Sequence, residues 1–372
     1  MKLALSAGLV FAAISCNFRL AEAQVPGCAF PNNTSQVANI VQQLGCFELQ
    51  QFKLPSISIA VSQKGNLLTA QAFGWHDFAT TTPATPTDTF QLGSLTKQYT
   101  AALIMTLVNA QKVDLDKAAS TYDGALPNDI SVRQLLNHTS GLADYLSFPG
   151  FSQWAKNGVQ TVTVINAIGS APRHFSPGTR FEYSNSNYYL LGRIIEQVSG
   201  QSYKAYLRGT ILQPLGLNDT NYGPTSTGYR FFGAPIASWD ASATYSAGAL
   251  SATATDVATW DDALFGGSLI NRTLLGIMQT PTRVPTLQNP SILSNYGMGI
   301  NTVPVAGGRL MYHSGAIAGF SSMNYFFPSG RVAIVVLVSQ DYSTYHNIQG
   351  FSDVIANRLC KGLQAPLSGS CG

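Results

Sequence analysis

Segments with the alternating hydrophobicity of β-strands lie near the two ends of this 372-residue chain, and segments with helical spacing lie between them. Residues 56–62 and 67–74 alternate around Lys64-Gly65-Asn66, which predicts a β-hairpin. Towards the other end, turn signals separate four more candidate strands, at 296–303, 309–313, 321–327 and 331–339. Because strands from both ends need partners, we expect one antiparallel sheet built from both termini.

Helical spacing dominates the middle of the chain. We predict helices at 94–110, 132–136, 161–168, 187–198 and 203–212, with further helices at 37–52 and 345–359. The expected fold class is therefore α/β (α+β): an antiparallel sheet flanked by helices, with an inserted, mostly helical region. We expect residues 24–372 to form a single unit, with the sheet part at about 24–90 and 240–372 and the helical part at about 91–239. The junction between a sheet edge and an inserted region is a natural place for a cleft.

The N-terminus has the three parts of a secretory signal peptide. Lys2 supplies the positive charge, residues 3–14 the apolar stretch, and Ala21-Glu22-Ala23 a small-x-small cleavage site. We expect residues 1–23 to be removed and the protein to be secreted. No other stretch approaches the roughly 18 apolar residues of a membrane span. Charged residues make up only 10% of the chain and the net charge is +3, which argues against nucleic acid and anionic membranes as partners.

Cysteines and glycosylation sequons fit export. After signal removal four cysteines remain, and the simplest pairing is Cys28 with Cys46 and Cys360 with Cys371. No Cys-x-x-Cys or Cys/His cluster indicates a metal, and we expect no cofactor. Four sequons are candidate glycosylation sites: Asn32, Asn33, Asn218 and Asn271. A fifth, at Asn137, follows an apolar helix and is expected to be sheltered.

Ser94 and Lys97 begin one of the predicted helices. Their spacing places a hydroxyl and an amine one turn apart on the same face. The free N–H groups at a helix start would face a developing anion, and a desolvated lysine can take the proton of a serine. Taken alone, the pair fits equally well a capping serine with a solvated lysine.

Two later segments could complete a site around Ser94. Tyr183 and Asn185 lie between the turn at 176–178 and the helix predicted from residue 187, where a loop fixed at both ends can aim side chains into a cleft. The third segment, His313-Ser314-Gly315-Ala316, ends a predicted strand. A strand edge can pair with an extended acyl substrate, and the Ala316 N–H can act as an oxyanion donor.

Ser94-x-x-Lys97, Tyr183-x-Asn185 and His313-Ser314-Gly315, in this order, resemble the serine β-lactamase/penicillin-binding-protein-like family, with its class C β-lactamase, DD-peptidase and esterase relatives. Residues 134–142, which end in His-Thr-Ser-Gly-Leu, are similar to a familiar segment of that family, as are 175–178 and 296–299. The likeness extends from about Pro55 to Leu359, and it implies a β-lactamase/transpeptidase-like fold.

The resemblance also implies roles. Ser94 would be the nucleophile, and Lys97 and Tyr183 would share the role of general base. Asn185, His313, Ser314 and Gly315 would bind substrate, and the N–H groups of Ser94 and Ala316 would form the oxyanion hole. His138 is interpreted as structural. The motifs Gly-x-Ser-x-Gly and His-Glu-x-x-His are absent, so α/β-hydrolase and zincin sites have no support.

One position departs from the β-lactamases. Most of them have lysine where this chain has His313, and a histidine with an ordinary pKa of about 6.5 changes its charge between pH 5 and 8. The alternative is that burial holds His313 neutral, so that it only orients Tyr183 or the end of the strand. The expected function is hydrolysis or transfer of a small ester or amide acyl group through acyl-Ser94. Esterase-like activity is favoured over D-amino-acid peptidase, and both over β-lactamase activity. The rival is a catalytically silent binding or scaffold relative. The sequence indicates no oligomeric state.

Overall fold

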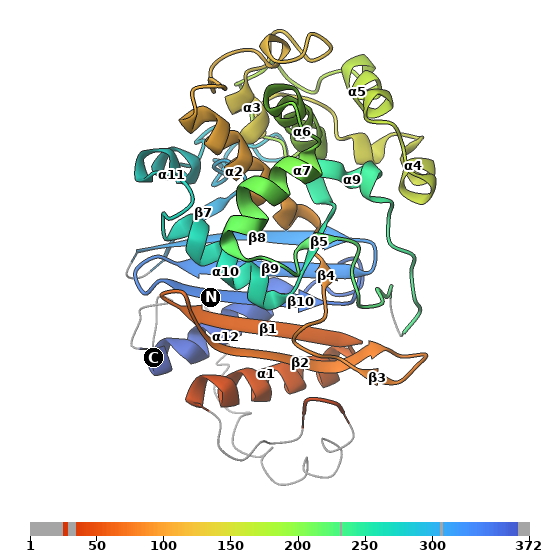
Figure 1. Ribbon diagram of the computed structural model, residues 1–372, viewed down its shortest axis with the longest axis vertical. Coiled ribbons are helices and arrows are strands. Elements are labelled where there is room, and N and C mark those ends of the chain that lie inside the picture. Colours follow the sequence, from red (N-terminus) through yellow and green to blue (C-terminus); the bar gives the residue numbers. More distant parts are fainter. Residues whose placement is uncertain (1–24, 29–34, 231–232, 306–307, 364–372) are drawn as a thin grey trace, which may run out of the picture.

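The computed structural model describes residues 25–28, 35–230, 233–305 and 308–363. Its centre is a seven-stranded antiparallel sheet in the order β3-β2-β1-β10-β9-β8-β7 (Figure 1). The N-terminal strands are β1 (Ser56–Gln63), β2 (Asn66–Asp77) and β3 (Thr82–Pro83). The C-terminal strands are β7 (Asn301–Val305), β8 (Gly308–Ile317), β9 (Phe320–Phe327) and β10 (Val332–Val338). Because β1 pairs with β10, the two groups form one sheet, and the predicted fold class is confirmed.

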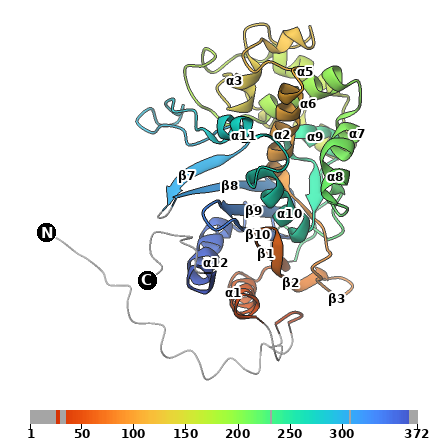
Figure 2. The same cartoon turned by 60° about the vertical axis from the view of Figure 1, so that its left-hand side comes forward.

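Helices cover both faces of this sheet. Helices α1 (Gln36–Phe52) and α12 (Ile348–Leu363) lie side by side on one face (Figure 2), and α10 (Ala254–Phe265) packs on the other. Alternate residues of β10 therefore join different cores: Val336 contacts the α1/α12 side and Val335 the opposite side. This double burial explains why the strand is apolar without interruption.

The rest of the chain forms a mostly helical region above the sheet in Figure 1. Its helices are α2 (Thr96–Asn109), α3 (Val132–Leu136), α4 (Phe151–Asn157), α5 (Thr161–Ser170), α6 (Asn185–Ser199), α7 (Tyr203–Leu207), α8 (Gln213–Leu215), α9 (Ala241–Gly248) and α11 (Arg272–Gln279). A small sheet, β4 (Phe90–Gln91), β6 (Leu250–Ala252) and β5 (Asn221–Tyr222), connects this region with the segment before Ser94.

Four predicted element boundaries are corrected by the structure. The strand predicted to end at 313 continues to Ile317 as β8, where it still pairs with β9. Residues 296–300 are not part of a strand, because they form a turn in which Gly297 packs on the backbone of Met278 and Gly299 on that of Lys97. Helix α6 begins at Asn185 rather than 187, and α12 begins at Ile348 rather than 345. The predicted hairpin at 64–66 is confirmed, with β1 paired to β2.

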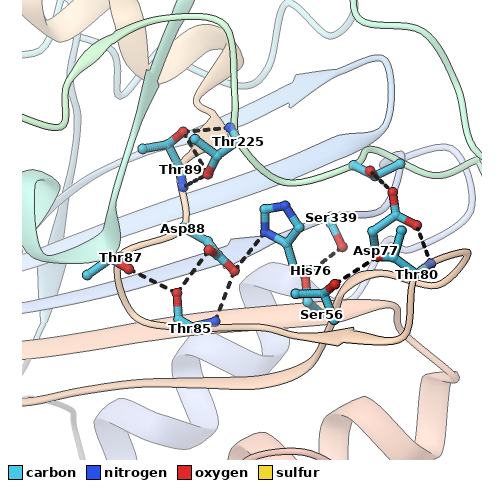
Figure 3. Close-up of polar contacts among 12 residues, drawn as sticks. Ser56, His76, Asp77, Thr80, Thr85, Thr87, Asp88, Thr89, Thr225 and Ser339 are labelled. Carbon is cyan, nitrogen blue, oxygen red and sulfur yellow. Dashed lines mark hydrogen bonds and ion pairs between the residues drawn. The ribbon is translucent and has the colours of Figure 1, made fainter.

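The segment that leads to β4 is fixed by polar contacts (Figure 3). Asp88 accepts hydrogen bonds from the backbone N–H and the hydroxyl of Thr85, and its carboxylate lies 3.2 Å from Nδ1 of His76. Next along the chain, the N–H of Thr89 donates to Thr225 at 2.9 Å. These contacts tie the end of β2 and a distant loop to the chain just before the serine.

A disulfide joins Cys28 to Cys46 in α1, as predicted. Cys360 lies in α12, but Cys371 is outside the described residues, as are residues 1–23 and the sequons at 32 and 33. Within the described ranges, no helix has the length and apolar character needed to cross a membrane.

Candidate active site

Ser94 lies in a tight turn that contacts the end of strand β8. The turn is a 3-10 helix, Gly93–Leu95, and α2 follows at once. Gly93 has φ +51°, and a Cβ at this position would lie 2.9 Å from the backbone nitrogen of Ala316. A Cβ on Gly315 would lie 1.9 Å from the carbonyl oxygen of Leu92. The absence of side chains at these two glycines therefore brings Ser94 and Ala316 together, as the oxyanion-hole hypothesis requires.

Lys97 is buried beneath the serine. Its Nζ lies 3.0 Å from Oγ of Ser94, 2.6 Å from Oδ1 of Asn185 and 2.8 Å from the carbonyl oxygen of Ala247. Burial lowers the pKa of the Lys97 ammonium to about 7, against an opposing contribution from the charge of Asp144. Near neutral pH the amine is therefore available as a base beside the serine hydroxyl.

The carbonyl of Ala247 reaches Lys97 through an irregular helix. Within α9, Tyr245 has φ +42° and ψ −129°, a conformation that costs free energy for a residue with a side chain. Gly192 in α6 allows the two helices to approach, because a Cβ there would lie 2.1 Å from Oγ of Ser246. The kink thus belongs to the framework that holds Lys97.

Tyr183 and Asn185 approach from the start of α6. The Nζ of Lys97 lies 4.9 Å from the centre of the Tyr183 ring, in cation–π contact. Burial raises the pKa of the Tyr183 phenol, and the neighbouring Ser94 hydroxyl only partly offsets this. The Tyr183 hydroxyl is buried and has no well-formed hydrogen bond within the described part of the chain. It is therefore a protonated donor facing the serine.

Asp144 is a site residue that the sequence reasoning missed. Its Oδ2 accepts a hydrogen bond of 2.8 Å from Nδ2 of Asn185, which directs the other amide atom, Oδ1, to Lys97. Its Oδ1 accepts from the N–H of Leu146. A lone aspartate has no motif of its own. The one signal was its position two residues after the segment that ends in Gly141-Leu142.

The third segment combines an open strand edge with a buried histidine. Strand β7 pairs with β8 only as far as Tyr312, so the edge of β8 from residue 313 onwards has no strand partner on that side in the described structure. The Ser314 and Ala316 side chains are exposed, whereas Gly315 is buried against Leu92. The open edge is the place where an extended substrate could add hydrogen bonds.

The surroundings of His313 distinguish between its two expected roles. Its side chain is only 3% exposed, with Nδ1 2.6 Å from the carbonyl oxygen of Ser314 and Nε2 2.9 Å from the Tyr296 hydroxyl. A carbonyl can only accept, so Nδ1 carries the proton and Nε2 accepts from Tyr296. Burial, with a contribution from the charge of Lys97, lowers the pKa of His313 to about 3. Of the two alternatives for His313, the burial and hydrogen bonds favour a neutral histidine over one that titrates between pH 5 and 8 in contact with a substrate carboxylate.

Tyr296 is a second residue that was missed, since only the family-like segment 296–299 pointed to it. Its ring contacts those of Tyr183 and His138, at centroid distances of 5.9 and 4.8 Å. His138 is fully buried, and its Nδ1 accepts from the backbone N–H of Ser184 at 3.3 Å. The structural interpretation of His138 fits this packing behind Tyr183.

A pocket of about 230 Å³ opens beside Ser94. Its walls are mainly apolar and contain no charged side chain; the lining residues are Gly93, Ser94, Tyr145, Leu146, Asn185, Trp239, Thr244, Ala247, Gly248, Ala316 and Ile317. Among the described residues, no group of three or more His, Cys, Asp or Glu side chains could hold a metal ion.

Comparison with known proteins agrees with this geometry. The family model described as Beta-lactamase matches residues 38–354. The chain belongs to the beta-lactamase family. Curated relatives include Protein flp of Staphylococcus aureus (strain NCTC 8325 / PS 47), 27% identical over 330 residues, which are 83% of this chain and 63% of the relative. The putative penicillin-binding protein PbpX of Bacillus subtilis (strain 168) is 28% identical over 288 residues, 74% of this chain and 68% of PbpX.

Solved structures with a similar fold include an amidase and a penicillin-binding protein homologue. The D-amino acid amidase of Ochrobactrum anthropi SV3, complexed with D-phenylalanine, superposes with a TM-score of 0.77 at 23% identity, covering 88% of this chain and all 100% of the amidase. The octameric penicillin-binding protein homologue of Pyrococcus abyssi has a TM-score of 0.71 at 24% identity, covering 90% and 78%. The chain thus has the fold of a family of serine acyl-hydrolases, as predicted, although it spans only 63% of the length of relatives such as Protein flp.

Proposed function

We propose that this chain is a secreted serine acyl-hydrolase that cleaves small, uncharged esters through an acyl-Ser94 intermediate. The observation that carries the proposal is the Lys97–Ser94 contact of 3.0 Å, made by a buried amine whose pKa is lowered to about 7. A neutral lysine has two N–H donors and one lone pair. Asn185 and the Ala247 carbonyl take the two donors, which leaves the lone pair for the Ser94 hydroxyl.

In the proposed reaction, Oγ of Ser94 attacks the acyl carbon while Nζ of Lys97 accepts the hydroxyl proton. The N–H groups of Ser94 and Ala316 stabilise the oxyanion. When the tetrahedral intermediate collapses, the bond to the leaving group breaks, and the protonated Tyr183 phenol donates to the departing oxygen, with Lys97 resupplying the proton. Water then cleaves the acyl-Ser94 ester, with the amine again as the base.

Two features support an uncharged ester. The pocket beside Ser94 has no charged side chain in its lining, and its walls include Leu146, Trp239 and Ile317. His313 is neutral and buried where most β-lactamases have a lysine, so it supplies no cation for a carboxylate. We expect p-nitrophenyl butyrate to be hydrolysed with a higher kcat/KM than the corresponding succinate monoester.

The proposal is tested with a fluorophosphonate and with p-nitrophenyl butyrate, read by intact mass and by turnover. The wild-type protein should gain one label at Ser94, whereas Ser94→Ala should gain none and lose activity by roughly a thousandfold or more. A Ser94→Ala variant with activity within about tenfold of wild type would disprove the nucleophile. An unlabelled, inactive wild type would favour a silent binding relative.

A second candidate is hydrolysis of D-amino-acid amides. Asp144 places a half-buried carboxylate beside Asn185, where it could pair with the ammonium of an amino-acid substrate. A structural neighbour is a D-amino acid amidase. A higher kcat/KM for D-phenylalanine p-nitroanilide than for p-nitrophenyl butyrate, lost in Asp144→Asn, would favour this candidate over the ester.

Export is part of the proposal. It rests on the sequence pattern of residues 1–23 and fits the Cys28–Cys46 disulfide. Of the described sequons, Asn218 is exposed, whereas Asn271 caps α11 and also bonds to Asn109. Expression in a eukaryotic secretory host should give a mature N-terminus at residue 24 and a glycan at Asn218. Protein that stays inside the cell with residues 1–23 still attached would contradict export.

A further inference from the structure

Strand β9 directs two buried polar side chains towards the catalytic turn. Ser322 and Asn324 are both fully buried and lie on the face of β9 that meets α2. The Ser322 hydroxyl donates to the carbonyl oxygen of Leu92 at 2.7 Å, two residues before Ser94. The strand therefore holds one end of the serine turn directly.

Asn324 contacts the first turn of α2 and strand β8 at the same time. Its Oδ1 accepts from the backbone N–H of His313 at 2.9 Å, and its Nδ2 donates to Oε1 of Gln98 at 3.0 Å. Gln98 follows Lys97 directly in α2, and His313 lies three residues before Ala316 in β8. One amide thus joins the element that carries the nucleophile and base to the element that carries the second oxyanion donor.

Asp261 in α10 holds Asn324 in place. Its Oδ1 accepts from Nδ2 of Asn324 at 2.5 Å, and Trp260 next to it donates to Gln98 at 3.2 Å. Asp261 is fully buried, and its Oδ2 has no hydrogen-bond partner in the described part of the chain. No salt bridge reaches it there. Burying a carboxyl group in this way costs free energy that an apolar residue would not.

We propose that Asn324, oriented by Asp261, is a positioning residue that fixes the Ser94–Lys97 turn relative to the Ala316 end of β8. This inference rests on the proposed function and deepens it. The Asn324 amide donates to Asp261 and Gln98 through its nitrogen and accepts from the His313 N–H through its oxygen. Neither a carboxylate nor an alkyl group offers both a donor and an acceptor. A displacement of about 1 Å between nucleophile and oxyanion donor is enough to cost on the order of a hundredfold in rate.

The test measures the rate of fluorophosphonate labelling at Ser94, kcat and KM for p-nitrophenyl butyrate, and Tm. The variants are Asn324→Leu, Asn324→Asp, Asp261→Asn and the exchange Asn324→Asp/Asp261→Asn. Glu48→Gln serves as the matched control, because Glu48 is a buried carboxyl that accepts from Tyr345 on the far side of the sheet.

We expect Asn324→Leu and Asn324→Asp to lower the labelling rate and kcat by about tenfold to a hundredfold, with KM changed little. Asp261→Asn keeps an oxygen that can accept from Asn324, so it should stay close to wild type. The exchange variant restores the donor–acceptor pair between residues 261 and 324 but not the donor to Gln98, so it should recover part of the rate lost in Asn324→Asp. Glu48→Gln should lower Tm without changing kcat.

A folded Asn324→Leu protein that is labelled at the wild-type rate would overturn the inference. If Asn324→Leu does not fold, the Asn324→Asp variant decides. The inference would be overturned if Asn324→Asp were labelled at the wild-type rate, or if the exchange variant recovered none of the rate that Asn324→Asp loses. Failure of the proposed function has a different signature, since wild type itself would then not be labelled at Ser94.

Discussion

Lys97 can act as a base only in its neutral form, because an ammonium has no lone pair to accept the Ser94 proton. Burial favours that form and lowers the pKa of the side chain to about 7. The same enclosure fixes the direction of the lone pair, since Asn185 and the Ala247 carbonyl occupy the two N–H groups. In the proposed reaction, desolvation and hydrogen bonding at this one residue would supply both the activation and the orientation of Ser94.

The pH dependence follows from this pKa. Deprotonation of Lys97 creates the active form, so kcat/KM for p-nitrophenyl butyrate should rise from pH 5.5 through about pH 7 and level off above it. The rate in Ser94→Ala is subtracted as the background of spontaneous hydrolysis. Lys97→Gln should lose the rise together with about a thousandfold or more of activity. A flat profile in wild type would contradict the assignment of Lys97 as the base.

In contrast to Lys97, His313 is expected to add no pH dependence to the reaction. With its pKa lowered to about 3, it stays neutral from pH 5 to 8. The ratio of kcat/KM between a carboxylate-bearing ester and its neutral counterpart should therefore stay constant over that range. Measuring both esters at the same pH values cancels the contribution of Lys97. A ratio that increases as the pH falls would show that His313 becomes charged and contacts the substrate.

At the scale of elements, the site depends on how closely the turn before α2 approaches the end of β8. Backbone atoms of the two segments meet where both have glycine, at Gly93 and Gly315. Side chains from β9 also hold the residues that flank the turn, at Leu92 and Gln98. The positions of the proposed oxyanion donors, the N–H groups of Ser94 and Ala316, are therefore set by contacts between backbones, which leave little room for adjustment.

Gly93→Ala tests this approach. The new Cβ would lie 2.9 Å from the Ala316 nitrogen at a φ of +51°, so the turn must move away from β8. We expect kcat to fall by about tenfold or more, and the free energy of unfolding to fall by about 1–2 kcal/mol. Gly169→Ala in α5 is the control, since a Cβ there meets nothing within 4 Å. Equal activity in both variants would show that the close approach does not matter.

At the scale of the whole molecule, the sheet lies between the candidate active site and helices α1 and α12. Helices α1 and α12 pack on the face opposite α10, and the Cys28–Cys46 disulfide lies on their side. Helices α2 and α6 contribute to the core on the other side, and they are drawn above the sheet in Figure 1. A change on the α1/α12 side can therefore alter stability without reaching the candidate active site.

Removing the disulfide should lower the stability of the protein without changing its catalytic rate. Cys28→Ser/Cys46→Ser opens a link that spans a sequence separation of 18, which is expected to cost about 3 kcal/mol of unfolding free energy. The kcat for p-nitrophenyl butyrate should stay within about twofold of wild type below the melting range, since additivity holds for distant sites. Urea unfolding measures the loss of unfolding free energy, and the ester assay measures kcat. A large fall in kcat at full folding would contradict this separation.

The sequence by itself determined what depends on local periodicity and spacing. Alternation predicted the hairpin of β1 and β2 and the last three strands, and helical spacing predicted α2 and α6 to within a few residues. The order Ser94-x-x-Lys97, Tyr183-x-Asn185 and His313-Ser314-Gly315 was enough to predict a family that the comparisons confirm. These patterns are visible because their members are neighbours along one helix, loop or strand.

Only the tertiary structure decided the contributions that depend on burial and on contacts between distant segments. Asp144 and Asn324 have no local motif, and Tyr296 was marked only by its family-like segment; each contacts a partner from another part of the chain. The lowered pKa values of Lys97 and His313 come mainly from desolvation. Desolvation is a property of the packed interior, so the same histidine that looked like a titrating substrate contact is a neutral, buried one in the folded protein.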